Sequence, residues 1–255
     1  PFLTGNVFLS DRSTDLNADA LNEKVFSAEL GYGYKSSKLS ANVNVYRTSW
    51  LDKSLTGSIP DPDNVGERLN YNIPGLDALH QGIELDFVYN LTNNLTMTGM
   101  VSLGDWQWKS NVSAIVRNQA GEQVGDPIEV FADGIKVGDA AQTTFALGAD
   151  FRLAQKSNIY VDYNFAGDNY SSYDVTNRGS SDLPDVWEIP DFGLFDIGLR
   201  HSFEMGAFEA TLIGKVNNVF NTEYVSDAND LDGTASTAQV YFGPGRTYSV
   251  GLKVN

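Results

Sequence analysis

Nine stretches of the chain alternate strictly between apolar and polar residues, and the apolar positions carry no formally charged side chain. Successive residues of a strand point to opposite faces of a sheet, so each stretch predicts a strand with one apolar and one polar face. The apolar positions fall every second residue within 26–34, 39–45, 83–89, 95–103, 145–153, 159–165, 195–203, 208–216 and 248–254.

The length of these stretches indicates what the apolar face contacts. Strands of soluble proteins are typically about five or six residues long, whereas these stretches extend to roughly a dozen. A strand that crosses a bilayer at a tilt needs about 9–11 residues, with apolar side chains toward lipid and polar ones toward the lumen. The pattern therefore predicts an all-β protein, a transmembrane antiparallel β-barrel.

Composition excludes several other classes. The chain of 255 residues has no cysteine, which excludes disulfide scaffolds, thiol catalysis and cysteine-based metal sites. Its net charge of −16 argues against nucleic-acid binding, which needs a basic surface. No apolar run reaches the roughly 18 residues of a membrane helix. No secretory signal begins the chain, so we expect a fragment of an exported protein.

Connectors alternate between short and long, as in outer-membrane barrels with short periplasmic turns and long extracellular loops. Short turns are predicted at 35–38, 90–94, 154–157 and 204–207. Long connectors are predicted at 51–78, 105–142, 166–191 and 221–239, before a last strand over 240–255.

This rhythm predicts about nine strands, and single-chain bacterial barrels use even numbers. Residues 1–255 are therefore expected to be the C-terminal part of a longer barrel wall, with 1–23 as the tail of an extracellular loop. Within the second long connector, 112–117 and 127–131 flank a turn sequence and predict a small projecting hairpin.

The last strands resemble those of TonB-dependent outer-membrane receptors. LIGKVNNVFNTEY at 212–224 is similar to the family's penultimate-strand pattern V-x-N-L-F-(D/N)-x-x-Y. GPGRTYSVGLKVN at 243–255 is similar to its final strand, which ends in a Phe that would here be residue 256. Residues 23–31, 41–50 and 82–86 also match the family's barrel, in a style nearest to receptors of Bacteroidetes.

The resemblance implies a receptor of the bacterial outer membrane with a 22-stranded barrel and an N-terminal plug. Such receptors take up siderophores, cobalamin, haem or glycans with energy from the TonB–ExbB–ExbD complex, and glycan importers work with a surface lipoprotein. It implies a transporter, not an enzyme, and membrane lipids and the barrel-assembly machinery as partners. The final strand is similar to that machinery's recognition signal, although wall packing explains the same residues: Tyr248, Val250, Leu252 and Val254.

Aromatic residues gather at or beyond the predicted extracellular strand ends. They could line a vestibule that grips a small-molecule nutrient, or they could anchor the barrel at the membrane interface. The histidines, His80 and His201, form no metal-ligand pattern, and no cofactor site or catalytic constellation is present in the sequence. The vestibule candidates are Trp50, Trp106, Trp108, Tyr170, Tyr173, Arg178 and Trp187.

Three other functions are compatible with parts of this pattern. A soluble extracellular β-sheet protein that binds carbohydrate would also alternate, and it would express without detergent. An outer-membrane enzyme would need a catalytic constellation that the sequence lacks. A passive porin would lack the receptor-like last two strands.

Overall fold

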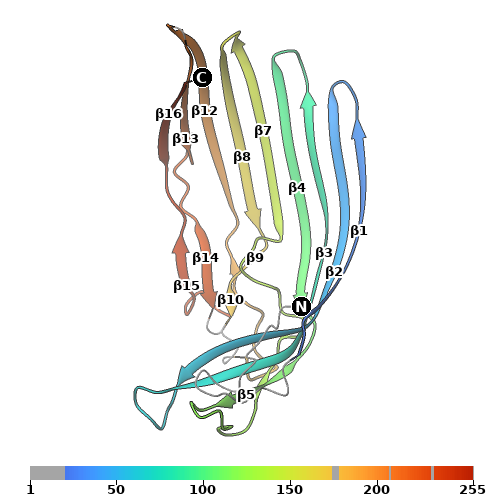
Figure 1. The fold of residues 1–255 in the computed structure, drawn as a ribbon, viewed down its shortest axis with the longest axis vertical. Coiled ribbons are helices and arrows are strands. Elements are labelled where there is room, and N and C mark those ends of the chain that lie inside the picture. Colours follow the sequence, from blue (N-terminus) through green and yellow to red (C-terminus); the bar gives the residue numbers. More distant parts are fainter. Residues whose placement is uncertain (1–20, 174–177, 207, 231–232, 255) are drawn as a thin grey trace.

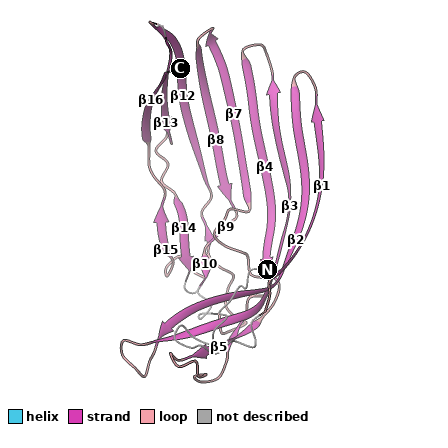
Figure 2. Cartoon of the chain, in the orientation of Figure 1, coloured by secondary structure: helices cyan, strands magenta, loops and turns pink. Residues whose placement is uncertain are grey.

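Nine long strands form one antiparallel sheet in the computed structural model, which describes residues 21–173, 178–206, 208–230 and 233–254 (Figures 1 and 2). The order is β1-β2-β3-β4-β7-β8-β12-β13-β16, and each strand pairs with its predecessor on this path. The predicted nine-stranded antiparallel wall is therefore confirmed. Its strands are β1 Lys24–Lys35, β2 Leu39–Pro60, β3 Arg68–Asn90, β4 Leu95–Trp108, β7 Thr143–Ala154, β8 Ser157–Gly167, β12 Phe192–Met205, β13 Phe208–Asn217 and β16 Thr247–Val254.

The strand register keeps the apolar positions on one face of the whole sheet. One cross-strand row runs Val43, Leu85, Val101, Phe145, Phe165 from β2 to β8. A slip of one residue would move every apolar side chain of a strand to the other face, so this register is fixed by the pattern. The sheet remains open, since β1 and β16 each pair with one strand among the described residues.

The apolar surface of the wall ends at a sharp polar row. Val45 and Ile83 pair across β2 and β3, and the next row outward holds Arg47, Gln81 and Asp105. Arg47 donates to Gln81 (2.6 Å), which donates to Asp105 (3.2 Å). Because charged groups are disfavoured against lipid, this row marks the outer limit of the apolar belt.

Short turns close the opposite, predicted periplasmic end of the wall, at the positions that the sequence predicts. Two of them use the same chemistry. The Ser36 hydroxyl accepts the backbone N–H groups of Lys38 and Leu39, and Thr92 does the same for Asn94 and Leu95. These hydroxyls replace strand hydrogen bonds that a tight turn cannot supply.

The prediction of a long loop over 51–78 is wrong, because most of this segment is β-strand. β2 and β3 continue beyond the wall as a hairpin, and the turn spans only 61–67. Bulges between Trp50 and Lys53 and between Lys53 and Leu55 shift the pairing, and Asp52 has a φ of 58°. A bulge changes which face later residues occupy, so the alternation that reveals the wall strands is lost there.

The predicted small hairpin is confirmed by β5 Val112–Arg117, which pairs with β6 Ile128–Val130 and with β3. The predicted last strand over 240–255 is interrupted at residues 243–246, where glycine and proline disfavour a continuous ladder. The remaining strands are short: β9 Asn169–Tyr170, β10 Ser172–Tyr173, β11 Glu188–Ile189, β14 Val225–Asp230 and β15 Gln239–Phe242.

A hydrophobic core lies at the end of the wall that the sequence predicts to be extracellular, among the connecting segments. Its centre includes Ile73 and Leu76 of β3, which are fully buried, with Trp108 of β4 and Val130 of β6. We call this region, 51–78 with 106–142, 168–173 and 178–191, the extracellular assembly. The assignment of 1–23 to a loop tail stays a prediction, because 1–20 lie outside the described residues. No helix in the described part of the chain has the length and apolarity to cross a membrane.

Candidate functional site

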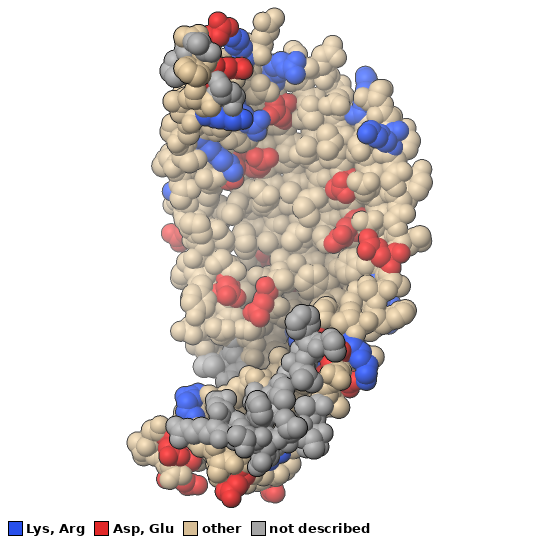
Figure 3. All heavy atoms as spheres, viewed as in Figure 1, with Lys and Arg blue, Asp and Glu red and all other residues tan. Residues whose placement is uncertain are grey.

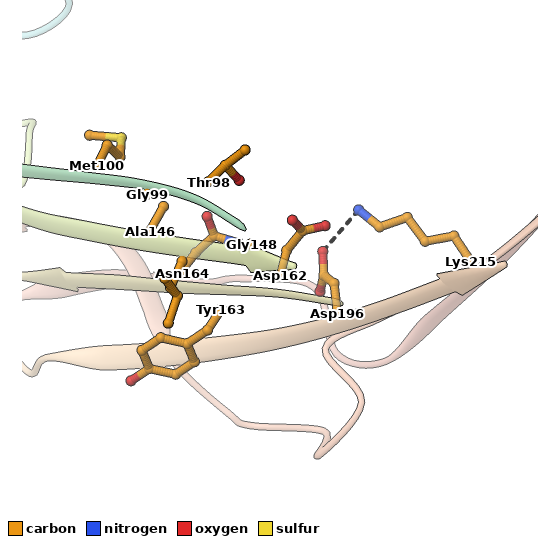
Figure 4. Close-up of a pocket in the computed structure, with 11 residues that line it drawn as sticks. Thr98, Gly99, Met100, Ala146, Gly148, Asp162, Tyr163, Asn164, Asp196 and Lys215 are labelled. Atoms are coloured by element: carbon orange, nitrogen blue, oxygen red, sulfur yellow. Dashed lines mark ion pairs between the residues drawn. The ribbon is translucent and has the colours of Figure 1, made fainter. Parts of the chain in front are cut away.

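The polar face of the wall carries charges that partly neutralise one another. Figure 3 shows acidic and basic side chains scattered over one face of the molecule. In the hollow of Figure 4, of about 330 Å³, Lys215 forms an ion pair of 2.9 Å with Asp196, and Asp162 lies nearby. The Tyr163 ring lies on the other side of the strands, as the alternation requires. This hollow has a polar lining suited to a hydrated lumen.

A second cavity, of about 270 Å³, lies between the wall and the extracellular assembly. Strand β2 contributes Trp50 and Lys53, β3 contributes His80, and β4 contributes Trp108. We call this the capped cavity. Aromatic side chains from three adjacent strands, Trp50, His80 and Trp108, therefore meet at the outer end of the polar face.

The His80 ring joins the capped cavity to an adjoining hollow of about 380 Å³. His80 lies between two tryptophans, with ring centroids 6.3 Å from Trp50 and 5.3 Å from Trp106. The Trp106 indole donates to the Tyr46 hydroxyl (3.0 Å), and Tyr46 lies over Gly82, where any side chain would overlap it. The absence of a side chain at Gly82 therefore leaves space for the Tyr46 ring, whose hydroxyl accepts the hydrogen bond from Trp106.

Asp139 lines the capped cavity from the connector after β6. The preceding Gly138 packs so closely that a Cβ there would overlap the carbonyl oxygen of Ser171. Asp139 adopts a φ of 68° and donates its N–H to the Tyr170 carbonyl (3.0 Å). Burial, and then the charge of Asp227, raise the pKa of the Asp139 carboxyl. A left-handed backbone at a non-glycine residue is uncommon, and here it occurs at a residue of the cavity lining.

Tyr173 of β10 lines the capped cavity opposite the wall tryptophans. Its ring meets Trp108 edge-on, with centroids 6.4 Å apart, and Arg178 stacks on it at 5.5 Å. Burial raises the pKa of the Tyr173 hydroxyl to about 12, so the group stays protonated at neutral pH. Arg178 is itself buried and donates to the Pro184 carbonyl, so its role is to hold Tyr173 in place.

Four polar atoms of side chains around this cavity are shut off from solvent without a hydrogen-bond partner among the described residues. They are the indole N–H groups of Trp50 and Trp108, Nε2 of His80 and the hydroxyl of Tyr173. A buried donor or acceptor without a partner costs about 1–3 kcal/mol, so such atoms are rare in native proteins. Asn70, Asn72, Asn169 and Ser171 carry the other four such atoms of the described residues, so half of the total belongs to residues around this one cavity.

The structure brings four of the seven vestibule candidates together. Trp50, Trp108 and Tyr173 lie around the capped cavity, and Trp106 lies beside it. The other three do not line either hollow. Tyr170 packs against the core with Lys136 5.9 Å from its ring, and Trp187 accepts the Ser171 N–H through its backbone.

Asp139 and Lys53 were not predicted from the sequence, and His80 had no predicted role at the site. Gly138-Asp139 is a turn signal within a long connector, but nothing in the sequence shows which strand end it approaches. Among residues 21–173, 178–206, 208–230 and 233–254, no three His, Asp or Glu side chains are placed to hold a metal ion.

Comparison with known proteins identifies a family and several similar folds for this chain. Residues 5–219 match the family model described as TonB dependent receptor-like, beta-barrel. No curated protein matches the chain. Among solved structures, the copper transporter OprC matches with a TM-score of 0.60 and 17% identity, over 90% of this chain and 30% of its own.

Two further structures give the same picture. BauA, the ferric preacinetobactin receptor from Acinetobacter baumannii, has a TM-score of 0.60 and 14% identity, over 98% of this chain and 32% of its own. The unliganded ferric citrate transporter FecA has a TM-score of 0.57 and 19% identity, over 91% and 31%. These likenesses concern the fold, and the chain spans about a third of the length of each structure.

Proposed function

Since the chain belongs to the TonB-dependent receptor β-barrel family, and is thus part of a bacterial outer-membrane protein, we propose that it serves a receptor that binds a scarce nutrient and imports it with energy relayed by TonB. The observation that carries this proposal is the match of residues 5–219 to the family's barrel, together with the nine-stranded wall. Relatives named as transporters of copper and ferric citrate support import over catalysis.

The receptor would bind its ligand at the extracellular end of the polar face. The predicted aromatic residues Trp50, Trp106, Trp108 and Tyr173 support this location, because they gather around the capped cavity and its neighbour. Aromatic rings offer a large apolar area and fixed polar edges, as ligand sites generally do.

The partners of the whole receptor would be those of its family. The TonB–ExbB–ExbD complex would act through parts outside this chain, and the barrel-assembly machinery would recognise the closing strand. Tyr248, Val250, Leu252 and Val254 of β16 are all exposed along this edge, which suits them either for recognition or for lipid contact.

The test is ligand binding by the full-length receptor in detergent, with and without a TonB C-terminal domain. Ferric chelates, cobalamin, haem and oligosaccharides would be titrated in parallel. We expect one class to bind tightly and to change the affinity for TonB. Absence of binding to every class would refute the receptor function.

The alternative of a soluble carbohydrate-binding sheet finds little support. Its sheet would bury one face against a core, whereas the apolar face here exposes side chains such as Leu30 and Val250. Expression of the folded chain in water without detergent would favour that alternative.

A further inference from the structure

We infer that the capped cavity binds one uncharged sugar ring of an oligosaccharide ligand. This inference deepens the receptor function proposed above and rests on it, because it names the chemical class that the site would take. It follows from the size of the cavity, its charge and the polar atoms around it.

The size of the cavity limits the ligand to about one ring. Pockets that enclose a drug-sized ligand measure about 300–1,000 Å³, and an engineered cavity of about 150 Å³ holds a benzene molecule. The capped cavity, at about 270 Å³, lies between these cases. It would accept a single ring with its substituents and leave the rest of a larger ligand in the adjoining hollow of about 380 Å³.

The charges in the lining of the cavity give an anionic ligand no net attraction. Asp139 lines it, and the like charge of Asp227 acts on Asp139. The cation Lys53 lies 5.4 Å from the Trp50 ring centroid, where the ring attracts it. One carboxylate and one ammonium offset each other, so the lining holds no excess positive charge that would favour an anionic iron chelate. A neutral ligand needs no such charge.

The polar atoms around the cavity suit hydroxyl groups. The two indole N–H groups, of Trp50 and Trp108, can only donate, whereas an ionised Asp139 can only accept. A hydroxyl both donates and accepts, so neighbouring hydroxyls on one ring can serve both kinds of group. The C–H faces of such a ring would pack on the aromatic side chains.

Small rotations of the rings would allow this contact. The indole N–H groups, Nε2 of His80 and the Tyr173 hydroxyl are sealed in the present arrangement. Each carries the cost of an unmade hydrogen bond, which a bound hydroxyl would remove. A ligand that enters between the wall and Tyr173 would thus recover free energy that the closed arrangement lacks.

The test uses the full-length receptor in detergent, titrated by calorimetry with neutral hexose oligosaccharides and, separately, with ferric citrate as an anionic chelate. Tyr173→Phe keeps the ring and removes its hydroxyl, and Trp50→Phe keeps an aromatic ring, though a smaller one, and removes the indole N–H. We expect saccharide binding that is about three- to tenfold weaker in each variant. Tyr241→Phe, the same chemical change as Tyr173→Phe at an exposed tyrosine outside the cavity lining, should leave the affinity unchanged.

Each other outcome would contradict either the position of the ligand, its chemical class or the receptor function. Saccharide binding that neither variant weakens would place the ligand elsewhere. Binding of ferric citrate or another class, without saccharide binding, would refute the sugar assignment and leave the receptor function intact. Failure of every ligand class would refute the receptor function itself.

Discussion

The two halves of β3 show two different ways to stabilise one strand. Its outer half, near Ile73 and Leu76, is buried in the extracellular assembly, whereas its inner half, near Leu85, is exposed on both faces. The outer half gains stability from packing within the chain. The inner half relies on ladder hydrogen bonds and on lipid and lumen as its surroundings.

This difference explains where a binding site can form. The wall repeats one alternation from strand to strand, and its polar face offers shallow hollows lined by ion pairs. The extracellular assembly breaks the alternation, bends the chain and encloses a cavity. Loops held on a rigid scaffold are where proteins generally place specificity.

The largest expected effect comes from emptying the core of the extracellular assembly. Leu76→Ala should lower the free energy of unfolding of this assembly by about 2–5 kcal/mol, because Leu76 is fully buried and leaves a cavity. Hydrogen exchange of the β3 amides would measure the change, with faster exchange in the outer half and unchanged exchange in the inner half. Val65→Ala, at a fully exposed turn position, serves as the control and should stay within about 0.5 kcal/mol. Equal acceleration along the whole strand would contradict the division of β3.

A charge on the apolar face should test the wall in turn. Leu85→Arg should destabilise the receptor in lipid vesicles by about 2–4 kcal/mol, because its row lies inside the apolar belt. Thr98→Arg on the polar face of β4 should change stability by less than about 1 kcal/mol. Denaturant unfolding in vesicles measures both variants. Similar losses in both would mean that the two faces do not differ in their surroundings.

The sequence predicted the wall well because each of its strands repeats a period of two, so that Leu95–Leu103 or Phe145–Leu153 reveals a strand without knowledge of its neighbours. The extracellular assembly follows no such period. The bulges after Trp50 and the burial of both faces near Ile73 erase the alternation, so 51–78 looked like a loop. The aromatic half of the site was foreseeable from composition at strand ends, whereas Asp139 reaches it only through the tertiary contact of Gly138 with Ser171.

A smaller effect should follow from Gly138→Ala. The added Cβ would overlap the Ser171 carbonyl oxygen, so the connector must move, at a cost of about 1–3 kcal/mol. Because Asp139 moves with it, ligand affinity should fall together with stability. Gly179→Ala, an exposed glycine of the same assembly with ordinary contacts, should change neither. Thermal unfolding and ligand titration of both variants measure these effects, and an unaltered Gly138→Ala receptor would show that the close approach is not needed.

The smallest expected effect is that of the Asp139 charge on the melting temperature. The pKa of Asp139 is raised in the folded state, mainly by burial, so the folded protein binds this proton more tightly than the unfolded chain. The stabilising contribution is complete below the unfolded pKa of about 3.8 and is lost as the pH rises through the higher folded pKa. Asp139→Asn stays neutral, so its melting temperature should exceed that of the wild type at pH 7, and the difference should shrink toward pH 3.

The comparison of these two curves separates Asp139 from other acids, such as Asp61, whose carboxyl pKa is lowered by hydrogen bonds from Asn64 and Asp63 and which is present in both proteins. A pH-independent difference would mean that Asp139 titrates as an ordinary surface acid. A higher melting temperature of Asp139→Asn at pH 7 would mean that the Asp139 charge destabilises the fold. A residue that does so is retained most readily when its charge serves binding. Two acids of the wall are instead paired with cations: Asp150 lies 3.7 Å from Arg200, and Asp196 lies 2.9 Å from Lys215.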